Sequence, residues 1–244
     1  TPSTQNKVRA AFFVALQWAV EMGMLPHHPG QGVRRVQEKK KERAIFELAE
    51  LENLFAKPWS DMRAYAACML AATTGARMGE VRGLQIRNLH LHQGHIDIVT
   101  NYVDGDGLKE PKWGSDRIGV PLHTRAIQAI RMVLRMHPFR RNPDAFVFFS
   151  ASSATRPVDY KVIEKALHER MAAVGITGGQ TFHSFRHTYV THLRGTIPEA
   201  KLIEIVEHTT TLTTDEYTHT SEEDRKSVQE AVERLLPSKQ AKRS

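Results

Sequence analysis

Residues 181–193 read TFHSFRHTYVTHL, and their spacing predicts a helix with two different faces. Four apolar residues recur at intervals of three and four and so predict one buried face; they are Phe182, Phe185, Tyr189 and Leu193. His183 and Arg186 project from another side, one turn apart. His187 follows His183 by four residues, a spacing that can bind zinc. Arg186 would repel a divalent cation there, so the trio fits an anion better.

Most of the remaining chain also has helical periodicity, interrupted by short segments that alternate as strands do. Apolar spacing predicts helices at 5–24, 45–55, 62–75, 124–136, 159–174, 183–194, 198–206 and 221–236. Ser221 and Asp224 are spaced as a capping box for the last of these. HIDIV (95–99) and RIGVPL (117–122) predict strands, and Gly114-Ser115 between them suits a tight hairpin turn. The pattern predicts a mainly α-helical α+β domain that contains a small antiparallel sheet.

Composition narrows the class of protein. The 244 residues carry 34 Lys and Arg against 27 Asp and Glu, a net charge of +7, and a basic surface attracts polyanions such as nucleic acid. Thirteen histidines leave a metal site open. The one cysteine, Cys68, excludes a disulfide framework and predicts a buried, reduced thiol. No apolar run of about 18 residues exists, so we expect no membrane partner.

The segment RRVQEKKKER (34–43) contains six basic and two acidic residues. This segment can be a solvated linker, or it can be a basic strap that lies along the phosphates of DNA. A linker that joins two DNA-binding parts of a protein would do both, and we favour this interpretation. The predicted DNA contacts are Arg34, Arg35, Lys39, Lys40, Lys41 and Arg43.

Three further fragments carry chemistry. In TTGARMGEVRGL (73–84), Arg77 opens a short helix after a glycine, which suits either a phosphate or an ordinary ion pair with Glu80. Lys112 lies at the predicted hairpin turn, five residues before Arg117. HTTTLTTDEYTHT (208–220) begins with His208 and contains Tyr217, one of five tyrosines.

These groups suit a reaction at a phosphodiester. Two arginines can neutralise the non-bridging oxygens of a pentavalent phosphorus, where charge develops in the transition state. A tyrosine hydroxyl can attack phosphorus to give a covalent phosphotyrosine, and a lysine or histidine can protonate the leaving hydroxyl. Fixed side chains supply the positive charge, so we expect no metal and no other cofactor.

The order of TGARMGE, a lysine in a β-hairpin, HSFRH, a later histidine and YTH resembles the tyrosine recombinase (phage-type integrase) family over residues 45–236. The resemblance implies a helical catalytic domain with a small antiparallel three-stranded sheet. It implies an enzyme of DNA integration, carried by a mobile genetic element: a site-specific recombinase that cleaves and rejoins DNA through a 3′-phosphotyrosine intermediate, without metal or ATP.

The resemblance also implies a role for each site residue. Arg77 and Arg186 would clamp the scissile phosphate, and Lys112 would be the general acid for the 5′-hydroxyl. His183 and His208 would orient the phosphate and move protons, and the nucleophile would be Tyr217. Two family positions differ here: Val206-Glu207 stands where leucine-glycine precedes the third histidine, and Phe185 replaces a leucine.

The same resemblance divides the chain and suggests its partners. Residues 1–35 resemble the last helix of a core-binding domain; a basic linker (36–44), the catalytic domain (45–236) and a basic tail (237–244) follow. Expected partners are double-stranded DNA, further copies of the chain (a tetramer on recombining DNA) and accessory DNA-bending proteins. The expected location is the prokaryotic cytoplasm, on the nucleoid.

Several alternatives remain open at this point. Lys109 competes with Lys112 as general acid, because the hairpin register is not fixed by VDGDG (103–107). Rival functions are a type IB topoisomerase, a DNA-binding protein without catalysis and a zinc-dependent hydrolase.

Overall fold

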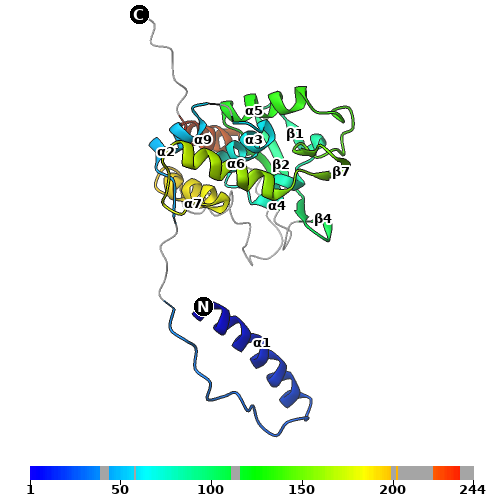
Figure 1. Ribbon diagram of the computed structural model, residues 1–244, viewed down its shortest axis with the longest axis vertical. Coiled ribbons are helices and arrows are strands. Elements are labelled where there is room, and N and C mark those ends of the chain that lie inside the picture. The colour runs from blue at the N-terminus through cyan, green and yellow to red at the C-terminus, as the bar shows by residue number, and fades with distance from the viewer. Residues whose placement is uncertain (39–43, 58, 111–115, 199–201, 203–221, 237–244) are drawn as a thin grey trace, which may run out of the picture. The chain divides into compact units, whose positions relative to one another are not determined.

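The computed structural model describes residues 1–38, 44–57, 59–110, 116–198, 202 and 222–236 (Figure 1). The chain divides into two compact units, the N-terminal unit Thr1–Glu42 and the C-terminal unit Arg43–Ser244. Several predicted features lie outside the described residues: the Gly114-Ser115 turn, most of the helix at 198–206, the Ser221 cap, and the site or strap residues Lys39, Lys40, Lys41, Arg43, Lys112, His208 and Tyr217.

The N-terminal unit is one helix with an extended segment beside it. Helix α1 (Pro2–Glu21) begins where the Thr1 hydroxyl accepts a hydrogen bond from the Thr4 amide. The chain then returns along the helix, because the Asn6 side chain exchanges two hydrogen bonds of 2.9 Å with the backbone of Val36. The predicted helix at 5–24 is therefore confirmed with both ends shifted toward the N-terminus.

The C-terminal unit is mainly helical, as predicted, and α3 (Met62–Thr74) lies at its centre (Figure 1). Eleven of the thirteen α3 residues are buried, which is the pattern of a helix covered on all sides. It packs against α5, α6 and α7. The described part of this unit also contains α2 (Leu48–Phe55), α4 (Met78–Gly83), α5 (Thr124–Arg135), α6 (Tyr160–Ala173), α7 (Phe182–Leu193) and α9 (Glu222–Glu233). Helix α4, only six residues long, was expected as a short helix after Arg77.

The predicted antiparallel sheet has three strands, as the family resemblance implies. Strand β2 (His95–Ile98) lies between β1 (Leu89–His90) and β5 (Arg117–Pro121), after the short 3-10 helix η1 (Ile86–Asn88). The segment between β2 and β5 forms a second hairpin that we did not predict, β3 (Asn101–Val103) with β4 (Gly107–Lys109). A third ribbon pairs β6 (Phe149–Ser150) with β7 (Ser153–Pro157) and was also missed. Ribbons this short give too few alternating residues to recognise.

A β-bulge changes the register of β5. Ile96 pairs with Val120, whereas Ile98 pairs with Arg117, so β5 carries one residue more than β2 between the two pairs. Gly119 takes a φ of 66° there, in the left-handed region that glycine enters most readily. The extra residue places the Arg117 side chain on the inner side of the sheet with Ile96 and Ile98, and leaves Ile118 exposed.

Helix α7 contacts two separate groups of buried side chains. Its four predicted core residues are all buried, as the periodicity indicates. Phe182 and Phe185 join the main core, whereas Tyr189 and Leu193 pack in a second cluster with Val232 and its neighbours from α9. Cys68 is fully buried in α3, and burial raises the pKa of its thiol. Within the described residues, no helix is long and apolar enough to cross a membrane.

Candidate active site

Arg77 lies where α4 begins, just after the left-handed turn that ends α3. Its backbone N–H donates to Glu80 Oε2 at 2.9 Å, and its Nη1 donates to Glu80 Oε1 at 2.8 Å. The ion pair that we considered as the ordinary alternative is therefore present. The Arg77 side chain is nevertheless 48% exposed, so the guanidinium can also meet a ligand from solvent.

Glu80 joins two arginines through one buried carboxylate. Its side chain is 7% exposed, and Oε2 also accepts a hydrogen bond of 2.7 Å from Arg117 Nη2. Burial alone would raise the pKa of Glu80, but the charge of Arg117 and the hydrogen bonds from Arg77 outweigh it and hold that pKa below its ordinary value. The carboxylate therefore stays ionised and fixes both guanidiniums.

Arg117 is the residue whose position the sequence did not reveal. Its side chain is only 4% exposed, and its Nη1 donates to the Thr74 carbonyl at 3.1 Å. In the sequence, Arg117 was notable only for lying five residues after Lys112. Regular alternation along the strand would place Arg117 on the opposite side from Val120, which predicts that it faces solvent. The glycine two positions later was the available signal for the bulge.

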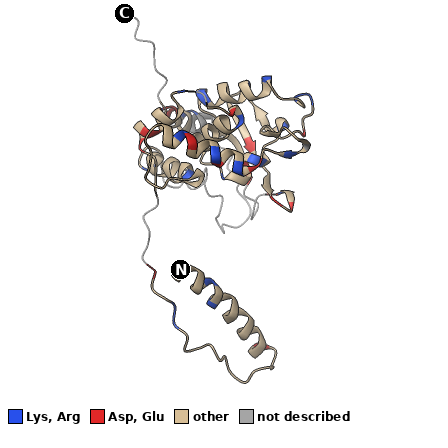
Figure 2. Ribbon diagram, in the orientation of Figure 1, with Lys and Arg blue, Asp and Glu red and all other residues tan. Residues whose placement is uncertain are grey.

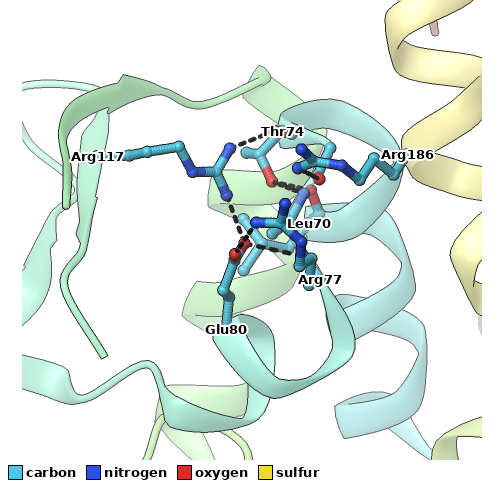
Figure 3. Close-up of polar contacts among 8 residues, drawn as sticks. Leu70, Thr74, Arg77, Glu80, Arg117 and Arg186 are labelled. Carbon is cyan, nitrogen blue, oxygen red and sulfur yellow. Dashed lines mark hydrogen bonds and ion pairs between the residues drawn. The ribbon is translucent and has the colours of Figure 1, made fainter. Parts of the chain in front are cut away.

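Arg186 reaches the same place from α7. It is 7% exposed, and its Nη1 donates to the Gly75 carbonyl at 3.0 Å. Thr74 and Gly75 are the last residue and the cap of α3, so their carbonyls carry the partial negative charge of a helix C-terminus. Arg77, Arg117 and Arg186 converge on this end of α3 (Figure 3). We call these three residues and Glu80 the arginine site.

Tyr189 supports the turn on which the arginine site is built. Gly75 has a φ of 65°, and a Cβ added there would lie 2.8 Å from the Tyr189 ring. Tyr189 is 1% exposed, and burial raises its pKa more than the charges of Arg117 and Arg186 lower it. It is thus a packing residue and not a hydroxyl presented to a substrate.

His183 is exposed on α7, one turn before Arg186, as the spacing indicates. Its ring centroid lies 4.6 Å from that of His187, so the two histidines of the predicted trio are neighbours, whereas Arg186 is buried and bonds to the Gly75 carbonyl. Within the described part of the chain, the one group of three potential metal ligands lies elsewhere, at His90, His95 and Asp97. The geometry at α7 therefore gives no support to the zinc alternative for this trio.

The remaining predicted residues are only partly described. Arg34 and Arg35 are exposed in the N-terminal unit, as a strap requires. Lys109, the competitor of Lys112, ends β4 and pairs with Asp106 at 2.5 Å across the hairpin turn. The carboxylate that pairs with Lys109 is thus that of Asp106 and not that of its neighbour in the sequence, Glu110.

Known proteins are similar to this chain in sequence and in fold. The model of the phage integrase family matches residues 44–224. Tyrosine recombinase XerC of Proteus mirabilis is 26% identical over 208 residues, which are 84% of this chain and 64% of that protein. Tyrosine recombinase XerD of Lacticaseibacillus casei is 27% identical over 226 residues, 90% and 73% of the two chains. The chain thus spans about two thirds of the XerC relative's length.

Solved structures agree with the fold. The Tn1549 transposon integrase in complex with a circular intermediate DNA has a TM-score of 0.71 at 20% identity, over 85% of this chain and 72% of that one. A lambda integrase tetramer bound to a Holliday junction has a TM-score of 0.63 at 16% identity, over 88% and 61%. The match of the family model, which spans all three converging arginines and the carboxylate between them, shows that this chain belongs to the phage integrase (tyrosine recombinase) family.

Proposed function

We propose that the C-terminal unit is the catalytic domain of a site-specific recombinase that cleaves and rejoins DNA strands. The observation that carries this proposal is the convergence of Arg77, Arg117 and Arg186 on the end of α3 (Figure 3). Three guanidiniums and one carboxylate give a local charge of +3 − 1 = +2. A pentavalent phosphorus carries more negative charge than the phosphodiester from which it forms, so such a site favours the transition state.

The three arginines have different partners, and we assign them different tasks: Arg117 is bound to a buried carboxylate, whereas the bond of Arg186 is to the Gly75 carbonyl. Arg77 and Arg186 clamp the non-bridging oxygens of the scissile phosphate. Arg117 is almost fully enclosed and already bound to Glu80 and Thr74, so it acts by its charge and by fixing Glu80. His183, exposed one turn before Arg186, donates a further hydrogen bond to the phosphate.

The proposed reaction is a transesterification. The Tyr217 oxygen attacks phosphorus and forms a 3′-phosphotyrosine bond, while the bond to the 5′-oxygen breaks and that oxygen takes a proton from Lys112. His208 accepts the proton that the Tyr217 hydroxyl loses as its oxygen bonds to phosphorus. The reverse steps rejoin strands, and because each step exchanges one phosphoester for another, neither ATP nor a metal is required. The ion pair of Lys109 with Asp106 supports Lys112 as the general acid.

We further propose that the substrate is double-stranded DNA and that several copies of the chain act together on it, with accessory DNA-bending proteins at some sites. The DNA-bound Tn1549 and lambda integrases are consistent with both points. Residues 1–35 are the end of a core-binding domain, 36–44 a basic linker and 237–244 a basic tail, and the boundary between the two units falls inside this linker. Lys and Arg lie on both units, as contacts along a polyanion require (Figure 2). The expected setting is a mobile element in the cytoplasm of a bacterium.

The test is to trap the covalent intermediate. DNA duplexes that contain candidate attachment sites from the source genome, each nicked near the exchange point so that a cleaved end diffuses away, are incubated with the protein in EDTA. We expect a protein–DNA adduct on denaturing gels with the wild type and none with Tyr217→Phe. Tyr160→Phe, a change of the same size in α6, is the matched control and should form the adduct normally.

Three results would contradict the proposal or redirect it. Adduct formation by Tyr217→Phe would remove the nucleophile assignment. A wild-type protein that is inactive in EDTA and restored by zinc or magnesium would favour the hydrolase. Relaxation of supercoiled plasmid without exchange of strands between two sites would favour a topoisomerase.

The basic strap at residues 34–43 is tested by the dependence of DNA affinity on salt concentration. DNA affinity should fall with salt by a log–log slope of about −0.9 for each phosphate contacted. Replacing Lys39, Lys40 and Lys41 together by glutamine should make this slope shallower. An unchanged slope would mean that the segment is only a solvated spacer.

A further inference from the structure

Two histidines and an aspartate meet on the outer side of the three-stranded sheet. His90 of β1 pairs directly with His95 of β2 in the antiparallel register. Asp97 follows His95 by two residues, so it projects from the same side, while Ile96 and Ile98 point into the core. We call His90, His95 and Asp97 the His–Asp cluster. None of the functions proposed above uses it.

The distances within the cluster are those of a nearly assembled ligand set. His90 Nε2 lies 2.9 Å from Asp97 Oδ2, and the two imidazole rings are 4.6 Å apart with planes inclined by 29°. One nitrogen or oxygen from each residue lies within 4.8 Å of the other two. An ion bonded at about 2.0–2.2 Å holds its ligand atoms roughly 3.5 Å apart, so small side-chain rotations complete the set.

The cluster is built on rigid elements and is supported from behind. All three residues lie in paired strands, so the backbone ladder fixes their Cα positions. Asp97 Oδ1 accepts a hydrogen bond of 2.8 Å from the Gly119 amide in the bulge of β5, which leaves Oδ2 turned toward His90. A hydrogen bond to the second oxygen of a carboxylate ligand is the usual support that orients it toward a metal.

We infer that the His–Asp cluster binds a divalent first-row transition metal ion, and that Zn²⁺ fits best. Two imidazoles and one carboxylate are ligands that zinc favours, whereas Mg²⁺ and Ca²⁺ prefer oxygen alone. The ion joins β1 to β2 and replaces the direct contact between His90 and Asp97. It takes no part in strand cleavage, because Arg117 points to the opposite side of this sheet. This inference is independent of the proposed recombinase activity.

Solvent and ions can reach the cluster. The side chains of His90 and Asp97 are 33% and 20% exposed. His95 also lines a hollow of about 440 Å³, whose wall includes Gly119, Lys226 and Gln229. The Lys226 ammonium works against a cation in this hollow, so its removal should strengthen binding of the ion.

The experiment uses the whole chain without a histidine tag, after treatment with a chelator. Isothermal titration with Zn²⁺, and the visible spectrum on addition of Co²⁺, should show one saturable site per chain. His90→Gln and Asp97→Asn should each weaken Zn²⁺ binding by about a hundredfold or more, since loss of even an outer partner of a ligand costs 10–100-fold. Zn²⁺ should raise the Tm of the wild type and not of these two variants.

Two control variants separate this site from other histidines, and a third variant tests the effect of the Lys226 charge. His92→Gln changes an exposed histidine in the turn between β1 and β2, and it should bind Zn²⁺ as the wild type does. His187→Gln removes one member of the pair on α7 and should also have no effect. Lys226→Gln should bind Zn²⁺ more tightly. Far-UV circular dichroism in EDTA checks that each variant is folded.

Three outcomes would overturn the inference. The first is the absence of saturable binding by the folded wild type with Zn²⁺, Co²⁺ and Ni²⁺. The second is binding that His187→Gln abolishes and His90→Gln leaves intact, which would place the metal on α7. The third is equal weakening by His92→Gln and His90→Gln, which would indicate diffuse binding to surface histidines.

Discussion

Glu80→Gln is the sharpest perturbation of the arginine site, because it keeps the shape of the side chain and removes its charge. Glu80 Oε2 accepts from the Arg77 amide and from Arg117 Nη2, whereas Oε1 accepts from Arg77 Nη1. A glutamine that keeps its oxygen at the Oε2 position preserves two of these bonds. Its NH2 group then faces Arg77 Nη1 donor to donor, so the Arg77 guanidinium must leave.

The expected magnitudes follow from burial. Removing one partner of a buried ion pair costs about 3–5 kcal/mol. Arg117 is enclosed but keeps one bond to the glutamine oxygen and one to Thr74, and Arg77 is half exposed, so we expect a loss of about 2–3 kcal/mol in the free energy of unfolding. Losing one oriented donor to the transition state costs about a hundred- to a thousandfold in rate, so cleavage should slow by about that factor.

Two assays separate these effects: urea unfolding, and single-turnover cleavage of a nicked duplex at saturating DNA. Asp104→Asn is the matched control, because it removes the carboxylate from another ion pair of α4, that of Arg82. It should leave the cleavage rate nearly unchanged. If Glu80→Gln lowers stability but cleaves within about threefold of the wild type, Glu80 is only a structural residue. If it changes neither quantity, Glu80 does not hold Arg77 and Arg117 in place.

The same carboxylate gives a dependence on pH. The pKa of Glu80 is lower in the folded chain than its ordinary value of 4.5. Its contribution to stability is therefore complete above that value and is lost as pH falls through the lower, folded pKa. Glu80→Gln should lose less stability than the wild type over this acid range, as urea unfolding at several pH values would show.

Gly75→Ala should destabilise the chain by about 1–3 kcal/mol and slow cleavage, because φ there is 65° and the new Cβ would lie 2.8 Å from Tyr189; urea unfolding measures the first effect, and normal stability would refute it. Arg186→Lys should slow single-turnover cleavage by about a hundred- to a thousandfold, since lysine cannot bind a phosphate through two N–H groups, and a near-normal rate would make Arg186 structural. Burial lowers the pKa of His123, whose ring lies 3.0 Å from the Leu236 carbonyl, against the opposing charge of Glu233. Folding favours the neutral form of His123, so the contribution of His123 to the free energy of unfolding is present above pH 6.5 and is lost as pH falls below it. His123→Gln should therefore reduce the loss of stability between pH 7.5 and 5.5, measured by urea unfolding. The same loss of stability in the variant and the wild type would contradict this.

The parts of the site that the sequence predicted are those carried by local patterns. Arg77 follows a glycine that must end α3, and Arg186 lies at a fixed spacing from four apolar residues that fix how α7 is turned. The uninterrupted apolar run of α3 likewise predicts a buried helix.

The parts that it did not predict depend on contacts across the chain. Glu80 was recognised as a partner of Arg77, but its bond to Arg117 spans 37 residues, a stretch that contains four strands, β1 to β4. The inward position of Arg117 depends on the β5 bulge, and a bulge breaks the alternation from which a side is assigned. The convergence of two arginines on the Thr74 and Gly75 carbonyls requires the packing of β5 and α7 against the same end of α3.

The bulge in β5 also has a consequence for protein engineering. Gly119 is a poor residue for a strand, and a procedure that optimises strand propensity would replace it with valine. Valine disfavours a φ of 66°, so the strand would regain its regular alternation. Ile118, now 60% exposed, would turn into the core, and Arg117 would turn out to solvent. The Gly119→Val chain would have a more regular sheet, but its arginine site would lack Arg117. A gain in thermal stability from this substitution would therefore be accompanied by a loss of activity.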